Sequence, residues 1–340
     1  MNTTGLVKYA GALVALAICS ACGGNSGASA GAPSTAALNV KYVGRMLSVN
    51  GRLVTAARVN MNPQPRLATL VADSHRGIGK HEYVINFYGT YATIFHYPKS
   101  VQQVGTINNV GGQGCTNVLY GYGKDIFWIV AADNQITEYK IPQRPLKTLS
   151  DSIGQPSSCA MNSSGDLAVG ILNGSGQGDV IIYKSASGTG TVYTTPLGAE
   201  YFDGYDPSGN LFADGFAGSG FALVELPKGG SKFQTITTSN SVEFPGSVQW
   251  DGTYLTVFDQ LANAMYQYTV SGTKATLKGT ISFNGSGDCA QTWIVKSLVY
   301  CGDAGTNGGE VFKYPAGGSP VATFTGNFAE PLGVVAAEKK

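Results

Sequence analysis

Short stretches in which apolar and polar residues alternate recur along most of the chain at a nearly constant interval. They are ATIFHYP (92–98), ITEYKIP (136–142), VIIYKSA (180–186), FALVELP (221–227), AMYQYTV (264–270) and EVFKYPA (310–316). Alternation with a period of two residues predicts a half-buried β-strand. Aligned at Tyr97, Ile141, Ser185, Leu226, Tyr268 and Tyr314, these stretches are separated by 44, 44, 41, 42 and 46 residues. The chain therefore contains a structural repeat of about 43 residues.

Each repeat holds more than one strand. A second strand follows the aligned one after a Gly/Pro/Ser turn, and another precedes it after a tight turn, as in DPSGNLFADG (206–215). A short segment such as FPGSVQW (244–250) comes first. Four strands in a unit of this length, without a long amphipathic helical stretch, predict the blade of a β-propeller. We expect an all-β fold of six four-stranded antiparallel blades over residues 67–340.

The two ends of the repeat region predict how the ring closes. The first unit has HEYVINF (81–87) and ATIFHYP but no inner strand, and residues 331–337 form an inner strand whose own unit does not continue. We expect the C-terminal strand to complete the first blade, because a closed ring leaves no unpaired edge. The alternative is a seven-bladed ring in which residues 40–66 form a degenerate blade.

Two stretches resemble the six-bladed propellers of the NHL-repeat and gluconolactonase-like superfamily. They are Pro331-Leu332-Gly333-Val334-Val335 and Gly209-Asn210-Leu211-Phe212-Ala213-Asp214. The resemblance covers residues 67–338 and implies the fold, whereas function does not follow from fold. Metal-dependent lactonases of this superfamily hold a divalent ion with a Glu, Asn residues and an Asp. This chain has no glutamate at a matching position, the nearest being Glu200 and Glu243, and Asn117 and Asp203 are the channel oxygens that remain.

The N-terminus predicts export and anchoring. Residues 1–21 contain Lys8 and the apolar run 10–18, which is shorter than the roughly 20 residues needed to span a bilayer. Small residues followed by Cys22 resemble a bacterial lipoprotein signal, which implies lipidation of Cys22 and a membrane as partner. An ordinary secreted protein cut near Ala21 or Ala30 is the alternative. Residues 22–39 are rich in Gly, Ala and Ser and predict a flexible tether.

Charge and composition exclude several function classes. The chain has 22 basic and 21 acidic residues, which argues against a nucleic-acid-binding surface. Residues 40–66 form a basic extension, which either attracts anionic lipid head groups or is a solvated hairpin turning at Asn50-Gly51. Chemistry built on several histidines is not expected, since the chain has only His75, His81 and His96.

Four cysteines remain beyond the signal. An exported chain meets an oxidising compartment, where disulfides form. Cys289 and Cys301 should face each other at one end of a hairpin, which predicts a bridge. Cys115 and Cys159 are one repeat apart and therefore occupy the same place in adjacent blades. They either form a second bridge or are two small apolar fillers.

A recurrent aspartate ends the second strand of four blades, at Asp133, Asp214, Asp259 and Asp303. One interpretation is a ring of carboxylates facing a cation or a polyhydroxyl ligand. The other is a turn device, because an Asp side chain accepts hydrogen bonds from nearby turn N–H groups. A carboxylate that recurs at the same point of each unit favours the structural interpretation.

Residues that break the repeat are the better candidates for binding at the channel mouth. We define the channel mouth as the face made by loops that enter the inner strands and loops that leave the second strands. The candidates are Asn117, Asp203, Tyr205, Gln291 and Trp293. Large side chains here either bind a sugar or a peptide or fill the spaces between blades.

These observations favour a monomeric, lipid-anchored propeller of the bacterial cell envelope, periplasmic or at the cell surface. It would act as a binding or scaffold module for a protein, peptide or glycan. The alternative is a metal-dependent hydrolase or lactonase, for which a calcium-like cation would be the cofactor. No catalytic residue set is recognised, so we expect no enzyme activity and no resident cofactor.

Overall fold

The structure is a computed structural model of the whole chain. It describes residues 40–43, 46–49, 52–55, 81–87, 91–108, 113–116, 123–124, 126–131, 135–140, 144–150, 153–172, 177–287, 289–306, 308–324, 326, 331 and 333–339. Cys22, Asn117 and Asp133 lie outside these residues, as do the predicted signal and tether. Within the described part, no helix is long and apolar enough to cross a membrane.

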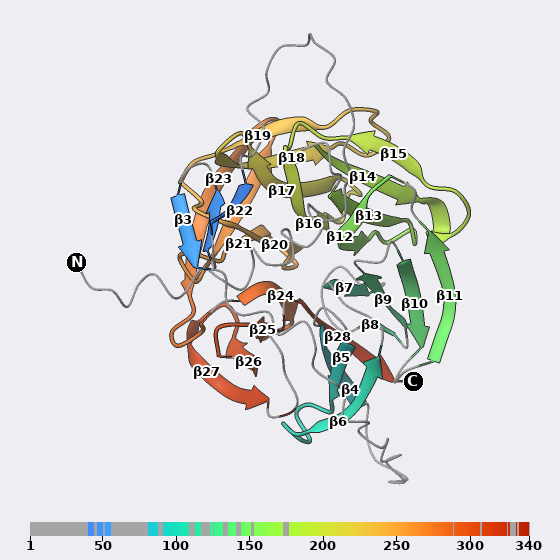
Figure 1. Ribbon diagram of the computed structural model, residues 1–340, viewed down its shortest axis with the longest axis vertical. Helices are drawn as coiled ribbons and strands as arrows, with labels where there is room; N and C mark the ends of the chain where they lie inside the picture. The colour runs from blue at the N-terminus through green and yellow to red at the C-terminus, as the bar shows by residue number, and fades with distance from the viewer. Residues whose placement is uncertain are drawn as a thin grey trace, which may run out of the picture.

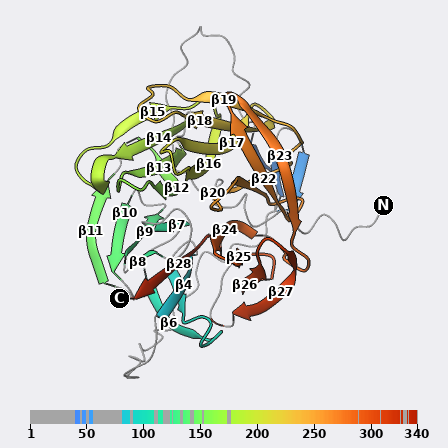
Figure 2. The same ribbon diagram turned by 180° about the vertical axis from the view of Figure 1, so that it is seen from behind.

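The strands form six blades arranged radially around a centre, which confirms the predicted propeller (Figures 1 and 2). Each blade is an antiparallel sheet of four strands. Written from the innermost strand outward, the first three blades are β28 (Gly333–Lys339), β4 (His81–Phe87), β5 (Tyr91–Phe95), β6 (Gln103–Asn108); β7 (Gln113–Thr116), β9 (Ile126–Ala131), β10 (Gln135–Lys140), β11 (Arg144–Ser150); and β12 (Gln155–Met161), β13 (Leu167–Leu172), β14 (Gly178–Tyr183), β15 (Thr191–Thr194).

The last three blades follow the same order. They are β16 (Ala199–Tyr205), β17 (Leu211–Ala217), β18 (Gly220–Leu226), β19 (Gln234–Thr238); β20 (Pro245–Trp250), β21 (Leu255–Asp259), β22 (Ala264–Ser271), β23 (Lys274–Ser282); and β24 (Cys289–Val295), β25 (Leu298–Asp303), β26 (Gly308–Lys313), β27 (Gly317–Phe324). Each of the six alternating stretches identified in the sequence forms the third strand of a blade.

The C-terminal strand closes the ring as predicted. β28 pairs antiparallel with β4, from Gly333 opposite Phe87 to Lys339 opposite His81. Residues Val334 to Ala337 are fully buried. A short strand, β8 (Gly123–Lys124), pairs with the other edge of β28. The last segment of the chain is therefore the innermost strand of the first blade.

Residues 40–55 form a sheet of their own and add no seventh blade. β1 (Val40–Val43), β2 (Met46–Val49) and β3 (Arg52–Thr55) pair in sequence order. β2 pairs antiparallel with β3, with Val49 opposite Arg52. The predicted turn at Asn50-Gly51 itself lies outside the described residues.

Burial increases toward the axis of the ring. Every residue of β16 and β24 is buried, whereas β11 is exposed along nearly its whole length. Inner strands are covered by neighbouring blades on both faces, and outer strands have one free edge. Blades 4 and 5 also join at the rim, where Thr237 of β19 pairs in parallel with Lys274 of β23. This contact makes the two blades one eight-stranded sheet, which the sequence did not predict.

Candidate functional site

A small cavity lies where the inner strands β7, β12, β16, β20 and β24 converge. Its volume is about 20 Å³, which is room for about one water molecule. Most of its lining is polar: Gln113, Ser158, Cys159, Phe202, Asp203, Ser247, Val248, Gln249, Gln291, Thr292 and Trp293. Three of the predicted channel-mouth candidates, Asp203, Gln291 and Trp293, therefore meet at this cavity. A sugar or peptide does not fit inside it.

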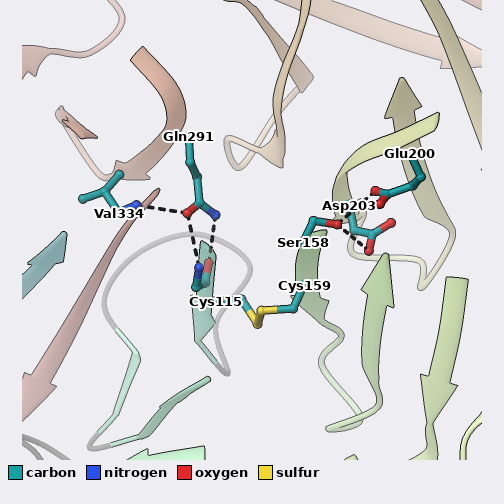
Figure 3. Close-up of a disulfide and its surroundings, with 8 residues drawn as sticks. Cys115, Ser158, Cys159, Glu200, Asp203, Gln291 and Val334 are labelled. Carbon is teal, nitrogen blue, oxygen red and sulfur yellow. Dashed lines mark hydrogen bonds between the residues drawn. A yellow bond between two sulfur atoms is a disulfide. The ribbon is translucent and has the colours of Figure 1, made fainter. Parts of the chain in front are cut away.

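Gln291 joins three blades across the axis (Figure 3). Its Oε1 accepts hydrogen bonds from the backbone N–H groups of Gly114, at 3.3 Å, and Val334, at 3.0 Å. Its Nε2 donates to the carbonyl of Gly114 at 2.8 Å. The amide thus connects β24 to the inner strands β7 and β28. Because all of these groups are buried, Gln291 satisfies backbone groups that would otherwise have no partner.

A similar connection joins blades 5 and 6. Gln249 Nε2 donates to the carbonyl of Ile294 at 3.2 Å, and its Oε1 accepts from the Ile294 N–H at 2.8 Å. The N–H of Thr292 donates to Ser247 Oγ at 3.1 Å, and the two hydroxyls also form a hydrogen bond. Much of the polar lining of the cavity is therefore engaged in holding the blades together.

The predicted bridge between Cys289 and Cys301 is present, and the pair that the sequence left open, Cys115 and Cys159, is bridged as well. Cys115 of β7 is bonded to Cys159 of β12, with the Cα atoms 5.7 Å apart, so this bridge links blades 2 and 3 (Figure 3). Cys289 and Cys301 are bonded within blade 6, again with 5.7 Å between Cα atoms. Asp303 lies close to this second pair, but sulfur atoms in a disulfide are not thiolate ligands for a metal. The two bridges indicate an oxidising, extracytoplasmic compartment.

Three buried carboxyl groups lie near the cavity on blade 4: Glu200 and Asp203 face blade 3, whereas Asp214 faces blade 5. Glu200 and Asp203 lie on β16 and Asp214 lies on β17, with 0%, 6% and 0% of their surfaces exposed. We call them the carboxyl cluster. Ser157 donates its hydroxyl to Glu200, and Ser158 Oγ lies 2.9 Å from both Glu200 Oε1 and Asp203 Oδ2 (Figure 3). One oxygen of Asp203 and both oxygens of Asp214 have no hydrogen-bond partner among the described residues.

Two glycines of blade 3 make the space that Glu200 occupies. A Cβ atom on Gly170 would lie 1.9 Å from Glu200 Oε2. A Cβ atom on Gly178 would lie 2.8 Å from the Cβ and the backbone N of Glu200. Any larger residue at either position would displace the glutamate. The sequences of β13 and β14 therefore accommodate a side chain that comes from the next blade.

Burial sets the protonation of the carboxyl cluster. It raises the pKa of Glu200 well above its usual range, and the charge of Asp203 raises this pKa further. Burial also raises the pKa of Asp203 to about 7, against the opposing hydrogen bond from Ser158. The pKa of Asp214 is raised for the same reason, and the charges of Asp203 and Asp259 add to the effect. No cation contributes to any of these shifts.

The hydrogen bonds agree with a protonated cluster. Ser158 has one hydroxyl proton, yet its oxygen lies at hydrogen-bond distance from two carboxyl groups. The second contact needs a proton carried by one of those groups. Glu200 is the group that burial and the neighbouring charge both favour in the neutral form. The cluster can therefore hold a proton, or take a cation in place of one.

The recurrent aspartates differ from one another in the structure. Asp259 accepts four backbone N–H groups, from Glu243 at 2.7 Å, Phe244 at 3.2 Å, Leu261 at 3.1 Å and Ala262 at 3.2 Å. Asp303 accepts two, from Gly287 at 2.5 Å and Thr306 at 3.0 Å. These contacts agree with the structural interpretation of the repeat. Asp214 differs, because no backbone N–H reaches it with normal hydrogen-bond geometry, although those of Gly246 and Phe202 lie near enough to lower its pKa against the effect of burial.

The remaining candidates lie apart from the cavity. Tyr205 is at the far end of β16, where it lines a groove between blades 3 and 4 instead of the cavity. Sequence reasoning missed Ser158 and Gly170, and it mentioned Glu200 only as lying near the expected position of a ligand. Both are small residues of blade 3. Their role can be recognised only when the structure places Glu200 of the next blade beside them.

No protein-family model matches the chain, and neither does any curated protein. Solved structures do resemble it. A chain of the crystal structure of a nidogen/laminin complex superposes with a TM-score of 0.60 at 12% identity, covering 76% of this chain and 98% of that one. A functionally unknown protein from Desulfotomaculum acetoxidans DSM 771 superposes with a TM-score of 0.55 at 9% identity, covering 77% and 100%. At these identities the likeness shows a shared fold, which is the β-propeller.

Proposed function

We propose that the protein is an extracytoplasmic binding module, held to the bacterial envelope by a lipid on Cys22. Its closed propeller would present loops at the channel mouth to a protein, peptide or glycan. One observation carries the proposal: polar side chains around the axis hydrogen-bond to backbone groups of neighbouring blades and leave a cavity of about 20 Å³. A ring closed in this way is a rigid frame, and a partner would bind to the loops outside it.

Binding to immobilised glycans and to envelope extracts tests this proposal, with the purified protein as the probe. We expect saturable binding that a chelator of divalent cations leaves unchanged. The double variant Ser241→Arg and Glu243→Arg places two large cations on a loop leading into β20, where both residues are exposed. It should weaken binding tenfold or more. The proposal would be contradicted if this variant, and variants with substitutions in the other channel-mouth loops, bound as tightly as the wild type.

The anchor has its own test. In the variant Cys22→Ser there is no thiol to acylate, so the protein should move from the membrane fraction to the soluble fraction of the envelope. A variant that still sediments with membranes would refute lipid anchoring without affecting the binding proposal.

A metal-dependent hydrolase is the second candidate, and the carboxyl cluster favours it. Asp203 is almost fully buried, its Oδ1 has no partner among the described residues, and it lines the cavity. Carboxylate oxygens suit a hard cation such as Ca²⁺, so Glu200 and Asp203, which both contact Ser158, would hold the ion. A bound cation supplies Lewis-acid chemistry, which polarises a carbonyl oxygen. The size of the cavity favours the first candidate, because it leaves no space for a substrate beside the ion.

Calcium titration calorimetry separates the two candidates. If the cluster is a cation site, wild-type protein binds Ca²⁺, Asp203→Asn loses this binding, and Asp206→Asn, at a half-buried aspartate outside the cluster, keeps it. Turnover of a sugar lactone that requires Ca²⁺ and disappears in Asp203→Asn would establish the hydrolase. The absence of calcium binding in the wild type would remove it.

A further inference from the structure

A second, larger cavity opens on the face opposite the channel mouth. It lies between blades 3 and 4 and has a volume of about 250 Å³. Its walls are the turns that join the first strand to the second in each of these blades, together with the turns that follow their third strands. We call it the blade 3–4 groove. Its size is close to the lower end of the roughly 300–1,000 Å³ range for small-molecule sites.

The corresponding place between blades 5 and 6 is closed by a group of three side chains. Gln267 Nε2 donates to Asp251 Oδ2 at 2.8 Å and to the hydroxyl of Tyr314 at 2.9 Å. The Tyr314 hydroxyl in turn donates to Asp251. This network joins the two blades across the gap. These three side chains therefore close the gap between blades 5 and 6 at this point.

Strand register identifies the equivalent residues in blades 3 and 4. Leu167 lies opposite Tyr183 as Leu255 lies opposite Tyr268, so Ile182 corresponds to Gln267. Leu211 and Leu226 lie opposite each other on the face toward the preceding blade, as Val299 and Phe312 do in blade 6. Two residues further on, Lys228 therefore corresponds to Tyr314.

Asn162 corresponds to Asp251, since each begins the turn after the first strand and accepts backbone N–H groups of that turn. Asn162, Ile182 and Lys228 all line the groove. The side chain of Ile182 cannot form hydrogen bonds and Lys228 replaces the tyrosine, so the three-residue connection is missing and the gap stays open.

The polar groups of the groove that remain available are mainly donors. Asp166 accepts from Lys184 Nζ at 2.9 Å, from the N–H of Ser185 at 3.0 Å and from Asn162 Nδ2 at 3.2 Å. Although burial opposes it, these contacts lower the pKa of Asp166, which keeps it an occupied carboxylate. Lys228 forms no ion pair within the described part of the chain, and the side chain of Lys184 is 79% exposed. The unpaired ammonium of Lys228, together with the exposed ammonium of Lys184 that Asp166 already engages, favours an anionic ligand.

Aromatic side chains supply the rest of the recognition surface. Tyr193 of β15 is half-buried and Tyr205 of β16 is buried, and both line the groove. An aromatic ring offers an apolar face with a polar edge, which suits the C–H face of a sugar ring. We propose that the blade 3–4 groove binds an anionic saccharide, with its ring against Tyr193 and its carboxylate or phosphate at Lys228 and Lys184. This site is separate from the channel mouth and does not depend on the function proposed there.

Titration of the purified full-length protein with four probes tests the site: D-glucuronate, D-glucose 6-phosphate, D-glucose and inorganic phosphate. Saturation-transfer NMR and calorimetry report binding. We expect both anionic sugars to bind at least tenfold more tightly than glucose and than phosphate, because each of those probes offers only one of the two recognition elements. Phosphate binding as tightly as glucose 6-phosphate would reveal a simple anion site and overturn the saccharide assignment.

Two surface substitutions separate the contributions. Lys228→Met should weaken the binding of the two anionic sugars tenfold or more and leave the binding of glucose unchanged. Tyr193→Ala should weaken the binding of all three sugars. Lys278→Met is the matched control, since Lys278 is an exposed lysine on β23 of blade 5, and it should bind as the wild type does. The proposal is overturned if neither sugar acid binds, or if Lys228→Met and Tyr193→Ala bind like the control. Neither result bears on the channel mouth.

Discussion

Replacing Asp203 with asparagine should change how the stability of the protein depends on pH. Asparagine keeps the shape of the side chain and an oxygen that accepts from Ser158, but it cannot ionise. The folded-state pKa of Asp203 is about 7, while an aspartate in an unfolded chain titrates near 3.9. This difference of about three pKa units corresponds to about 4 kcal/mol of unfolding free energy.

The sign follows from which state holds the proton. Because the folded pKa is the higher one, the folded protein binds more protons than the unfolded chain between about pH 4 and pH 7. The stabilisation is complete below pH 4 and is lost as the pH rises through 7. Asp203→Asn does not lose it. The free energy of unfolding of the variant, minus that of the wild type, should therefore rise by about 4 kcal/mol from pH 4 to pH 9.

Urea unfolding followed by tryptophan fluorescence at several pH values measures this difference, since Trp128, Trp250 and Trp293 report on three blades. Burial also raises the pKa of Glu310, to about 8, but Glu310 titrates in both proteins and its effect cancels in the difference. Two curves that stay parallel within about 1 kcal/mol from pH 4 to pH 9 would refute the assignment of a buried, protonated cluster.

Three further predictions concern how the blades are held together. Replacing both cysteines of the bridge between blades 2 and 3 with alanine should lower the free energy of unfolding by about 4 kcal/mol, and replacing the pair within blade 6 should lower it by about 3 kcal/mol. The first loss is larger because that bridge closes a longer loop, with sequence separations of 44 and 12 residues. The reversed order in urea unfolding would contradict this account. Gly170→Ala should destabilise the protein by about 3 kcal/mol, and Glu200→Ala should recover most of that loss because only the glutamate side chain is in the way. In Gly178→Ala the new Cβ also meets the backbone of Glu200, so adding Glu200→Ala should not restore the lost stability. Equal recovery of stability by Glu200→Ala in the Gly170→Ala and Gly178→Ala backgrounds would contradict this prediction. Gln291→Ala should cost about 3 kcal/mol by leaving buried backbone groups unpaired, with faster hydrogen exchange at Gly114 and Val334; unchanged exchange there would show that the amide does not hold the blades.

The architecture was accessible from the sequence because its signals are local. Alternation with a period of two marks each third strand, and a nearly constant spacing places one such strand in every blade. The closing strand was recognisable because the first unit lacks an inner strand and the last segment is an inner strand without a unit. The bridge between Cys289 and Cys301 was predicted for the same reason, since both residues belong to one hairpin.

The site depends on contacts between blades, which no single repeat contains. Asp214 and Asp259 occupy the same position in successive blades, yet Asp259 accepts four backbone N–H groups and Asp214 accepts none with normal geometry, a difference that the repeat does not show. Glu200 is buried next to Ser158 and Gly170, which lie 42 and 30 positions earlier in the chain. The groove is open because Ile182 and Lys228, from different blades, replace the hydrogen-bonded pair Gln267 and Tyr314.

The sequence by itself determined that the chain forms a closed ring of six sheets and which segment completes it, because strand periodicity and repeat length are properties of neighbouring residues. Only the tertiary structure decided which carboxyl groups are buried without a cation and which gap between blades stays open. Both depend on side chains that the ring brings together from separate repeats, where burial and missing partners, rather than residue type, set the chemistry.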